Sequence, residues 1–238
     1  MKQIGIIGVG LLGGAVASRL LDANFEVTGY DIRPEQVGAL GSRGLSAANN
    51  IAGVAANSDA VFTILPSLDS VEATICGAGG LLDTVPRTCT LIQMSTISPT
   101  LSRRLAAAAA TKERGFLDAP MSGTSTMVAR GDGVIYLAGE RARADACRPI
   151  YGAIAKKTHY LGEAGMASLA KLATNLLVGL NTAALAEALV LGAKGGMDLA
   201  VLVEILKDSA GASQMLEVRG PLMASGCFEA QMKVELFL

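Results

Sequence analysis

A glycine-rich turn near the N-terminus constrains the fold of this chain more than any other feature. Residues Gln3 to Ile7 predict a fully buried strand, and Gly8-Val9-Gly10-Leu11-Leu12-Gly13 follows directly and leads into a helix through Leu21. In this context the first two glycines permit a tight turn and close approach of the backbone to a pyrophosphate, and the third lets the helix pack against the strand. The helix N-terminus would supply N–H donors to the phosphates.

An acidic residue follows the turn at the spacing that dinucleotide-binding units use. A second strand, Phe25 to Tyr30, ends at Asp31, which lies roughly 20 residues beyond the turn. A carboxylate there hydrogen-bonds the adenosine ribose and repels a 2′-phosphate, so the sequence favours NAD over NADP, although Arg33 weakens this preference. The alternative is a glycine-rich turn of another α/β protein, with Asp31 as an ordinary strand-end acid.

Strands and helices continue to alternate after Asp31. Strands are predicted at Ala60 to Leu65, Thr88 to Met94, Val134 to Ala138 and Lys157 to Leu161, with helices at about 68–76, 98–112 and 141–152. This alternation predicts an α/β fold with a Rossmann-type doubly wound parallel sheet, whose ligands bind beyond the carboxyl ends of the strands. Leu65-Pro66 and Ser95-Thr96 fall at those ends, so they either line the cofactor cleft or are simple strand-terminating turns.

A further predicted strand, Gly115 to Met121, runs into Ser122-Gly123-Thr124. Small hydroxyl residues and glycine at a strand end can present N–H and O–H donors to a carboxylate. The same residues can equally form the N-cap of a following helix, and the sequence leaves both interpretations open.

The longest helical pattern begins after Gly162 and Gly165 and runs to about Lys194. Its apolar residues cover most of the circumference, which predicts a helix buried on nearly all sides. One polar edge remains, where Ser168, Lys171 and Asn175 share a face. A lysine on the wet edge of a buried helix suggests a site, against the ordinary alternative of a solvated lysine.

The strand pattern stops at this helix, which divides the chain into two domains. Residues 1–162 are expected to form the dinucleotide-binding domain, and 163–238 an all-helical second domain joined to it by the long helix. Further helices are predicted from an Asp198 cap to about Lys207 and around 212–224 and 228–238.

Composition excludes several classes of function. The net charge of −1 gives no basic field for nucleic acid or an anionic membrane, and no uninterrupted apolar run approaches the ~20 residues of a membrane span. The one His, His159, lies in a predicted strand, and the four Cys lack paired ligand spacing, so we expect no metal and no disulfide framework. The start of the chain lacks a signal-type apolar core. Together these features favour a soluble protein of the reducing cytoplasm.

Several blocks, in this order, resemble the β-hydroxyacid dehydrogenase family, whose best-known member is 3-hydroxyisobutyrate dehydrogenase. The resemblance covers essentially the whole chain. The glycine turn is shared with many dehydrogenases, whereas the block Asp118-Ala-Pro120-Met-Ser122-Gly123 followed by the block Gly162 to Asn175 is specific. The remaining matches are Leu65-Pro66, Gly77 to Leu81, Ser95-Thr96, Ala186-Glu187-Ala188 and Gly196-Met-Asp198.

The resemblance implies an oxidoreductase that transfers a hydride between NAD(P) and a small β-hydroxy acid or its semialdehyde. Lys171 would be the general acid and base, because a lysine can donate a proton to the substrate oxygen and partial burial can lower its pKa. Ser122, Gly123 and Thr124 would hold the substrate carboxylate and Asn175 would also bind substrate. The cofactor would contact Gly8, Val9, Gly10, Leu11, Leu12, Gly13, Asp31, Leu65, Pro66 and Thr96.

Two departures from the family pattern bear on these expectations. Thr124 stands where the family usually has a second glycine, so the carboxylate pocket would be narrower or carry an extra hydroxyl. The chain also stops at Leu238, where relatives continue into a Lys-Asp pair and further helices, so we expect a C-terminally truncated chain.

Two alternative functions remain open. One is an NADPH-dependent reductase of glyoxylate, succinic semialdehyde or tartronate semialdehyde. The other is a catalytically silent dinucleotide-binding module, whereas imine reductases are disfavoured because they generally lack the lysine. The apolar helical region further predicts a homodimer or homotetramer.

Overall fold

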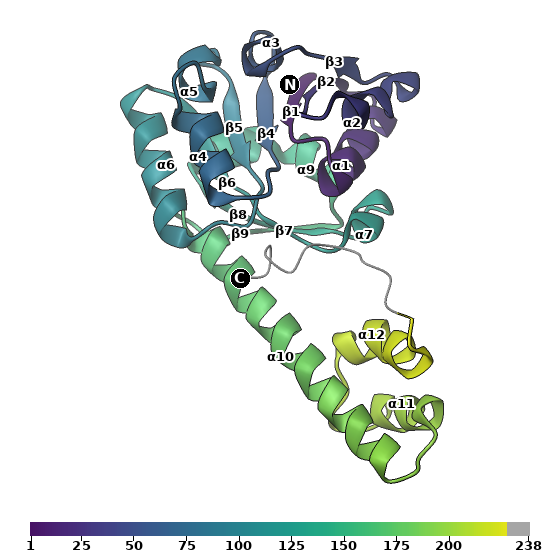
Figure 1. The fold of residues 1–238 in the computed structure, drawn as a ribbon. Coiled ribbons are helices and arrows are strands. Elements are labelled where there is room, and N and C mark those ends of the chain that lie inside the picture. Colours follow the sequence, from purple (N-terminus) through teal and green to yellow (C-terminus); the bar gives the residue numbers. More distant parts are fainter. Residues whose placement is uncertain (228–238) are drawn as a thin grey trace. The chain divides into compact units, whose positions relative to one another are not determined.

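The computed structural model describes residues 1–227. The chain divides into two compact units, Met1–Leu172 and Ala173–Leu238. The boundary between these two units lies inside one long helix, ten residues beyond the predicted domain boundary at 162. That domain boundary stays a prediction. Figure 1 shows the fold.

The first unit alternates strands and helices, as the sequence predicts. Its strands are β1 (Gln3–Ile7), β2 (Glu26–Tyr30), β3 (Ser46–Ala47), β4 (Ala60–Thr63), β5 (Thr90–Gln93), β6 (Gly115–Asp118), β7 (Met121–Ser122), β8 (Val134–Gly139) and β9 (Lys157–Tyr160). Its helices are α1 (Leu11–Asp22), α2 (Pro34–Gly38), the 3₁₀ turn η1 (Gly41–Arg43), α3 (Ile51–Ala55), α4 (Leu68–Cys76), α5 (Leu81–Thr84), α6 (Pro99–Thr111), α7 (Ser125–Ala129), α8 (Arg141–Ala146) and α9 (Arg148–Ile154).

The strands form one mixed sheet in the order β3-β2-β1-β4-β5-β6-β8-β7, with β9 paired to β8. Every pair from β3 to β6 is parallel, so the predicted doubly wound parallel sheet is confirmed there. The far edge differs, because β8 runs antiparallel to both β6 and β7. The carboxyl ends of β1, β4, β5 and β6 therefore meet at one edge, where the predicted cofactor residues lie.

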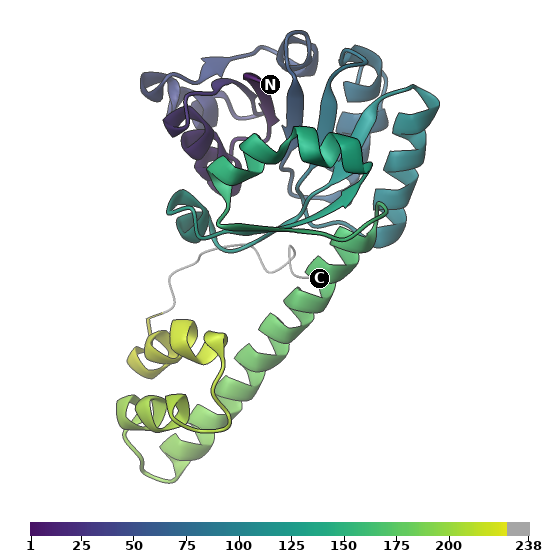
Figure 2. The same ribbon diagram turned by 180° about the vertical axis from the view of Figure 1, so that it is seen from behind.

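Helices cover both faces of the sheet, as Figures 1 and 2 show from opposite sides. Alternate residues of the central strands, such as Ile6, Phe62 and Ile92, pack under α1, α8 and α9. The intervening residues, such as Val61 and Leu91, pack under α3, α4, α5 and α6. Burial of both faces explains why these strands read as continuous apolar runs rather than alternating ones.

Two predicted elements are divided in the structure. The strand predicted over Gly115 to Met121 is two strands, because Ala119-Pro120 separates β6 from β7 and Pro120 has no N–H for a sheet ladder. The helix predicted near 141–152 is α8 and α9, which meet at Cys147 just before Pro149. Both predictions were wrong at a proline, where the apolar pattern continues but the hydrogen-bond pattern cannot.

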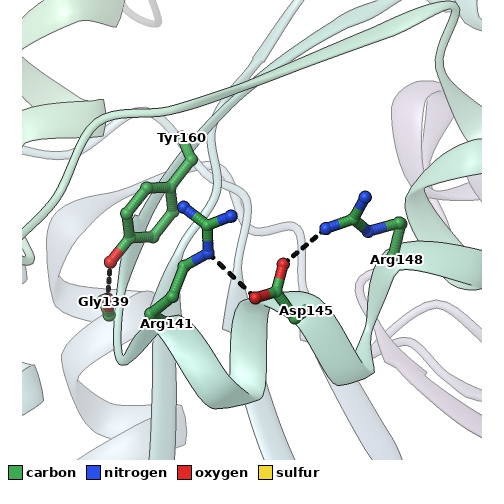
Figure 3. Close-up of polar contacts among 5 residues, drawn as sticks. All are labelled: Gly139, Arg141, Asp145, Arg148 and Tyr160. Atoms are coloured by element: carbon green, nitrogen blue, oxygen red, sulfur yellow. Dashed lines mark hydrogen bonds and ion pairs between the residues drawn. The ribbon is translucent and has the colours of Figure 1, made fainter.

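A polar cluster on the surface fixes β9 at the edge of the sheet (Figure 3). The Tyr160 hydroxyl donates to the Gly139 carbonyl at 2.8 Å, and the Arg141 guanidinium lies over the Tyr160 ring at 4.8 Å. Asp145 accepts hydrogen bonds from both Arg141 and Arg148. The Gly139 N–H in turn donates to the Gly162 carbonyl at 2.7 Å, so the loop that follows β9 is held at its second residue.

A long helix, α10 (Met166–Lys194), begins in the first unit and continues into the second. The second unit adds α11 (Leu199–Lys207) and α12 (Gln214–Ser225). Its core is formed by Leu185, Leu189, Leu202, Val203 and Leu216. The predicted cap is confirmed, because the Asp198 carboxylate accepts hydrogen bonds from the N–H groups of Ala200 and Val201. The helix predicted at 228–238 lies outside the described residues.

The prediction that α10 is buried on nearly all sides was wrong for the single chain. Leu176 is 62% exposed and Leu191 75% exposed, and Leu169, Leu177, Leu180 and Val190 are similarly open. An apolar sequence pattern indicates that a helix surface is covered, but it does not show whether the same chain or another molecule covers it. Within residues 1–227, α10 is also the one helix long and apolar enough to cross a membrane, and a single helix of this kind is weak evidence for a span.

Candidate active site

The glycine-rich turn between β1 and α1 has the geometry that the sequence predicts. Gly8 has φ of +92°, and a Cβ there would lie 2.2 Å from the Ile64 carbonyl oxygen. A Cβ on Gly13 would lie 1.9 Å from the Gly8 carbonyl oxygen, so α1 packs directly on the turn. Gly10 is the N-cap of α1 and makes no side-chain cap bond, and the nearest atom to a Cβ there is 3.8 Å away. This open backbone at the start of a 12-residue helix fits a pyrophosphate.

Asp31 follows β2 and closes the turn from the other side. Its Oδ2 accepts a hydrogen bond from the Val9 N–H at 2.8 Å, and its Oδ1 accepts one from the Arg33 N–H at 2.9 Å. The side chain is only 8% exposed, while that of Arg33 is 58% exposed, with its Nε 3.8 Å from Oδ1. The carboxylate is thus held beside the turn at the position predicted for ribose recognition.

A buried hydrogen-bond network joins the two strand-end segments, Leu65-Pro66 after β4 and Ser95-Thr96 after β5. The Ser95 Oγ accepts from the Leu65 N–H at 2.8 Å. Gln93, fully buried, accepts from the Ser95 N–H at 2.6 Å and donates from Nε2 to the Ser95 carbonyl at 2.8 Å. The structure therefore brings these predicted cofactor residues to one edge. Gln93 was not predicted from the sequence. The available signal was a polar residue at the last position of an otherwise apolar strand.

The predicted carboxylate-binding segment begins at Ser122, the last residue of β7, and continues through Gly123 to Thr124, which precedes α7. Gly123 has φ of +137°, which favours glycine. Thr124 is the N-cap of α7, and its Oγ1 accepts from the Met127 N–H at 3.3 Å. Of the two interpretations left open, the helix cap is present, while a role of these three residues in carboxylate binding stays a prediction.

Lys171 is partly buried on the second turn of α10. Burial lowers the pKa of its ammonium group from 10.5 to about 8, because removal from water disfavours the charged form. Within residues 1–227 no hydrogen bond or salt bridge neutralises this charge or joins it to Ser122 or Gly123. A lysine with a pKa of about 8 and no ionic partner among residues 1–227 can take up and release a proton near physiological pH.

The other two residues of the predicted polar edge have different environments. Ser168, one turn before Lys171, is 1% exposed and hydrogen-bonded to Asp118, so it is a structural residue rather than part of a wet edge. Asn175 lies one turn after Lys171, in the part of α10 that belongs to the second unit, and it is partly buried. Its role in substrate binding stays a prediction.

Asp118 is a buried acid that contacts the start of α10, and its place in the family block was the one expectation attached to it. It ends β6, has no exposed surface, and receives three hydrogen bonds from the start of α10. Among the described residues there is no cluster of His, Cys, Asp and Glu that fits a metal ion. His159 lies exposed on β9, with its ring 6.4 Å from that of Tyr136.

Two family models match nearly the whole chain. Residues 3–162 match the NAD binding domain of 6-phosphogluconate dehydrogenase. Residues 165–238 match the NAD-binding family of NADP-dependent 3-hydroxyisobutyrate dehydrogenase.

Named relatives and a solved structure agree with these models. The chain is 35% identical to 2-(hydroxymethyl)glutarate dehydrogenase of Eubacterium barkeri, over 91% of this chain and 72% of the relative. It is 35% identical to 3-hydroxyisobutyrate dehydrogenase of Pseudomonas aeruginosa, over 93% of this chain and 74% of the relative. A crystal structure of 3-hydroxyisobutyrate dehydrogenase from Salmonella typhimurium matches with a TM-score of 0.89 and 28% identity, over 100% of this chain and 83% of that chain.

Proposed function

The chain belongs to the β-hydroxyacid dehydrogenase family of NAD(P)-dependent enzymes, and on this basis we propose that it transfers a hydride between NAD(P) and a small β-hydroxy acid or its semialdehyde. Lys171 is the general acid and base of this proposal. The observation that carries it is a partly buried lysine, without an ionic partner in the described residues, whose pKa is lowered to about 8.

The proton and the hydride leave the substrate separately in the oxidative direction. A nicotinamide cofactor held at the glycine-rich turn would supply the acceptor for the hydride of the carbon that carries the hydroxyl group. Neutral Lys171 takes the hydroxyl proton, so that a carbonyl forms and the lysine becomes an ammonium group. In the reductive direction the same ammonium group returns the proton to the substrate oxygen, on which negative charge develops.

The remaining residues of the proposal bind the two reactants. The backbone of Gly8, Gly10 and the start of α1 would hold the pyrophosphate, and Asp31 the adenosine ribose, which favours NAD over NADP. The Ser122-Gly123 segment would bind the substrate carboxylate through N–H and O–H donors, and Asn175 would hold substrate beside Lys171. The exposed guanidinium of Arg33 near Asp31 supports the alternative, an NADPH-dependent reductase of small semialdehydes, because it could pair with a 2′-phosphate.

The exposed surface of α10 and the cysteines support a proposal for assembly and location. We propose a homodimer or homotetramer in which a second copy covers the apolar side of α10. The four cysteines, Cys76, Cys89, Cys147 and Cys227, are all unpaired, which supports a reducing cytoplasm.

The experiment that tests the function is a spectrophotometric screen of small hydroxy acids, including 3-hydroxyisobutyrate and 2-(hydroxymethyl)glutarate, with NAD and with NADP. Lys171→Ala should lower kcat by orders of magnitude and leave NAD affinity nearly unchanged. The control is Lys157→Ala, which removes an exposed lysine of β9 and should keep activity. Equal losses of turnover and NAD affinity in Lys171→Ala would mean that the lysine is structural.

A further inference from the structure

We propose that Asp118 is a positioning residue for the proton-transfer step: it fixes the first turn of α10, and through it Lys171, at the carboxyl end of β6. The inference rests on the role proposed for Lys171 and adds the residue that determines where this lysine stands.

Both carboxylate oxygens of Asp118 are used to hold α10. Oδ2 accepts hydrogen bonds from the backbone N–H groups of Gly165 and Ser168, each at 3.0 Å. Oδ1 accepts one from the Ser168 hydroxyl at 2.8 Å. The first N–H groups of a helix have no partner within the helix, so a carboxylate at this place satisfies them and also interacts favourably with the helix dipole.

The start of α10 has little freedom to shift around this contact. Asp118 is completely buried and Ser168 is 1% exposed, so water cannot replace the hydrogen bonds. Gly165 has φ of +93°, and a Cβ there would lie 2.9 Å from the Pro99 carbonyl oxygen, so the turn is pressed against α6. The hydrogen bond between Gly139 and Gly162 fixes the loop three residues earlier. Lys171 follows Ser168 by three residues, so it lies one helical turn beyond the residues that Asp118 fixes.

The same residue also lies just before the segment proposed to bind the substrate carboxylate. Asp118 ends β6, and the chain passes through Ala119-Pro120 to Met121-Ser122 of β7, which Gly123 follows. In the sheet, Asp118 stands in register with Gln93 of β5, the residue that holds Ser95 and, through it, Leu65. Two neighbouring residues, at the ends of the adjacent strands β5 and β6, therefore position three parts of the proposed site. These parts are the proton donor, the carboxylate-binding segment and the cofactor edge.

Asp118→Leu removes the hydrogen bonds of the carboxylate, whereas Asp118→Asn has nearly the same size and removes only its charge. The leucine leaves the two N–H groups unpaired, whereas the asparagine can accept from both through its oxygen while the Ser168 hydroxyl rotates to accept from its amide. Amide hydrogen exchange of the peptide 163–172, followed by mass spectrometry, should lose protection by roughly tenfold or more in Asp118→Leu and keep it in Asp118→Asn. Unchanged protection in Asp118→Leu would overturn the proposal.

Turnover of 3-hydroxyisobutyrate with NAD measures the consequence for Lys171. A misplacement of about 1 Å can cost roughly 100-fold in rate, so kcat of Asp118→Leu should fall about 30-fold or more while its NADH affinity changes less than about twofold. Asp118→Asn should restore kcat to within about fivefold. A loss of protection without a loss of kcat, or a loss of kcat in Asp118→Asn with protection kept, would overturn the proposal.

A double-mutant cycle shows whether Asp118 acts through Lys171. In the Lys171→Ala background, Asp118→Leu should lower the residual kcat by less than about threefold, whereas additive losses would mean that the two residues act independently. If Asp118→Leu does not fold, Ser168→Ala is used in its place, because it removes only the hydrogen bond to Oδ1. Both the exchange protection and kcat should then fall, by less than in Asp118→Leu. Unchanged protection and kcat in Ser168→Ala, when Asp118→Leu does not fold, would overturn the proposal.

The control and the wild-type assay keep the two proposals distinguishable. Ser58→Ala, two residues before the amino end of β4, removes a buried 2.6 Å hydrogen bond to the Val54 carbonyl and should leave both readouts unchanged. If Lys171→Ala retains full turnover, the proton-transfer role proposed for Lys171 fails, and the exchange experiment still decides whether Asp118 holds α10. If Lys171→Ala is inactive and Asp118→Leu turns over normally, only the positioning role fails.

Discussion

The Val9 N–H donates a 2.8 Å hydrogen bond to Oδ2 of Asp31, so the glycine-rich turn and the end of β2 form one structural unit. The carboxylate that is proposed to recognise the ribose is thereby also part of the turn that is proposed to hold the pyrophosphate. A substitution at Asp31 consequently changes both the electrostatics and the geometry of the cofactor edge.

Asp31→Asn and Asp31→Ala are expected to separate these two effects. Asparagine can still accept from the Val9 N–H but has no charge, so it should reduce the preference for NAD over NADP by about tenfold, roughly 1.4 kcal/mol, without a large loss of NAD affinity. Alanine removes the acceptor as well and should weaken the binding of both cofactors. The measurement is kcat/KM for NAD and for NADP in each variant. An unchanged cofactor ratio in both would refute the ribose role.

Gly13→Ala is expected to disrupt the turn, because its Cβ would lie 1.9 Å from the Gly8 carbonyl oxygen. The backbone must shift, which should cost roughly 1–3 kcal/mol or more in the free energy of unfolding and weaken NADH binding at least tenfold. The matched control is Gly14→Ala on the same helix, where the nearest atom is 3.6 Å away and alanine should stabilise by about 0.5–1 kcal/mol. Urea unfolding measures the stability of both variants, and NADH fluorescence measures their cofactor binding. Similar stabilities for the two variants would contradict the close packing of Gly13 on Gly8.

The pH dependence of turnover should report the lowered pKa of Lys171, about 8. Oxidation needs the neutral amine, so its rate should rise as the pH passes through about 8 and then level off. Reduction needs the ammonium group, so its rate should be constant below about 8 and fall above it. Rate profiles in both directions, with saturating cofactor, test this assignment. Two limbs that bend near 10.5 would show that the lysine is fully solvated in the working enzyme.

Leu177→Glu and Leu180→Glu are expected to weaken self-association, because these side chains are 60% and 57% exposed on the apolar side of α10. A charge buried in a subunit interface without a partner costs several kcal/mol, so each variant should shift the sedimentation profile toward monomer. Gln214→Glu, which adds the same charge at an exposed position in the first turn of α12, should leave the profile unchanged. A wild-type chain that sediments only as monomer would contradict the proposed assembly.

Much of the fold follows from local sequence patterns. The turn Gly8 to Gly13 specifies its own backbone conformation, and the buried apolar runs of β1, β4 and β5 predict parallel strands covered on both faces. The predictions were wrong where a proline removes a backbone hydrogen bond that the apolar pattern does not register, as at Pro120, which separates β6 from β7, and at Pro149, which lies at the junction of α8 and α9.

The sequence by itself determined the cofactor turn, the order of strands and helices and the family blocks, because each depends on residues that are near one another in the chain. Tertiary structure decided what holds the proposed catalytic helix. Asp118 and Ser168 lie 50 residues apart, and only the folded sheet places the end of β6 beneath the first turn of α10. It also decided which face of α10 is exposed, since the burial of an apolar helix depends on the surfaces that reach it.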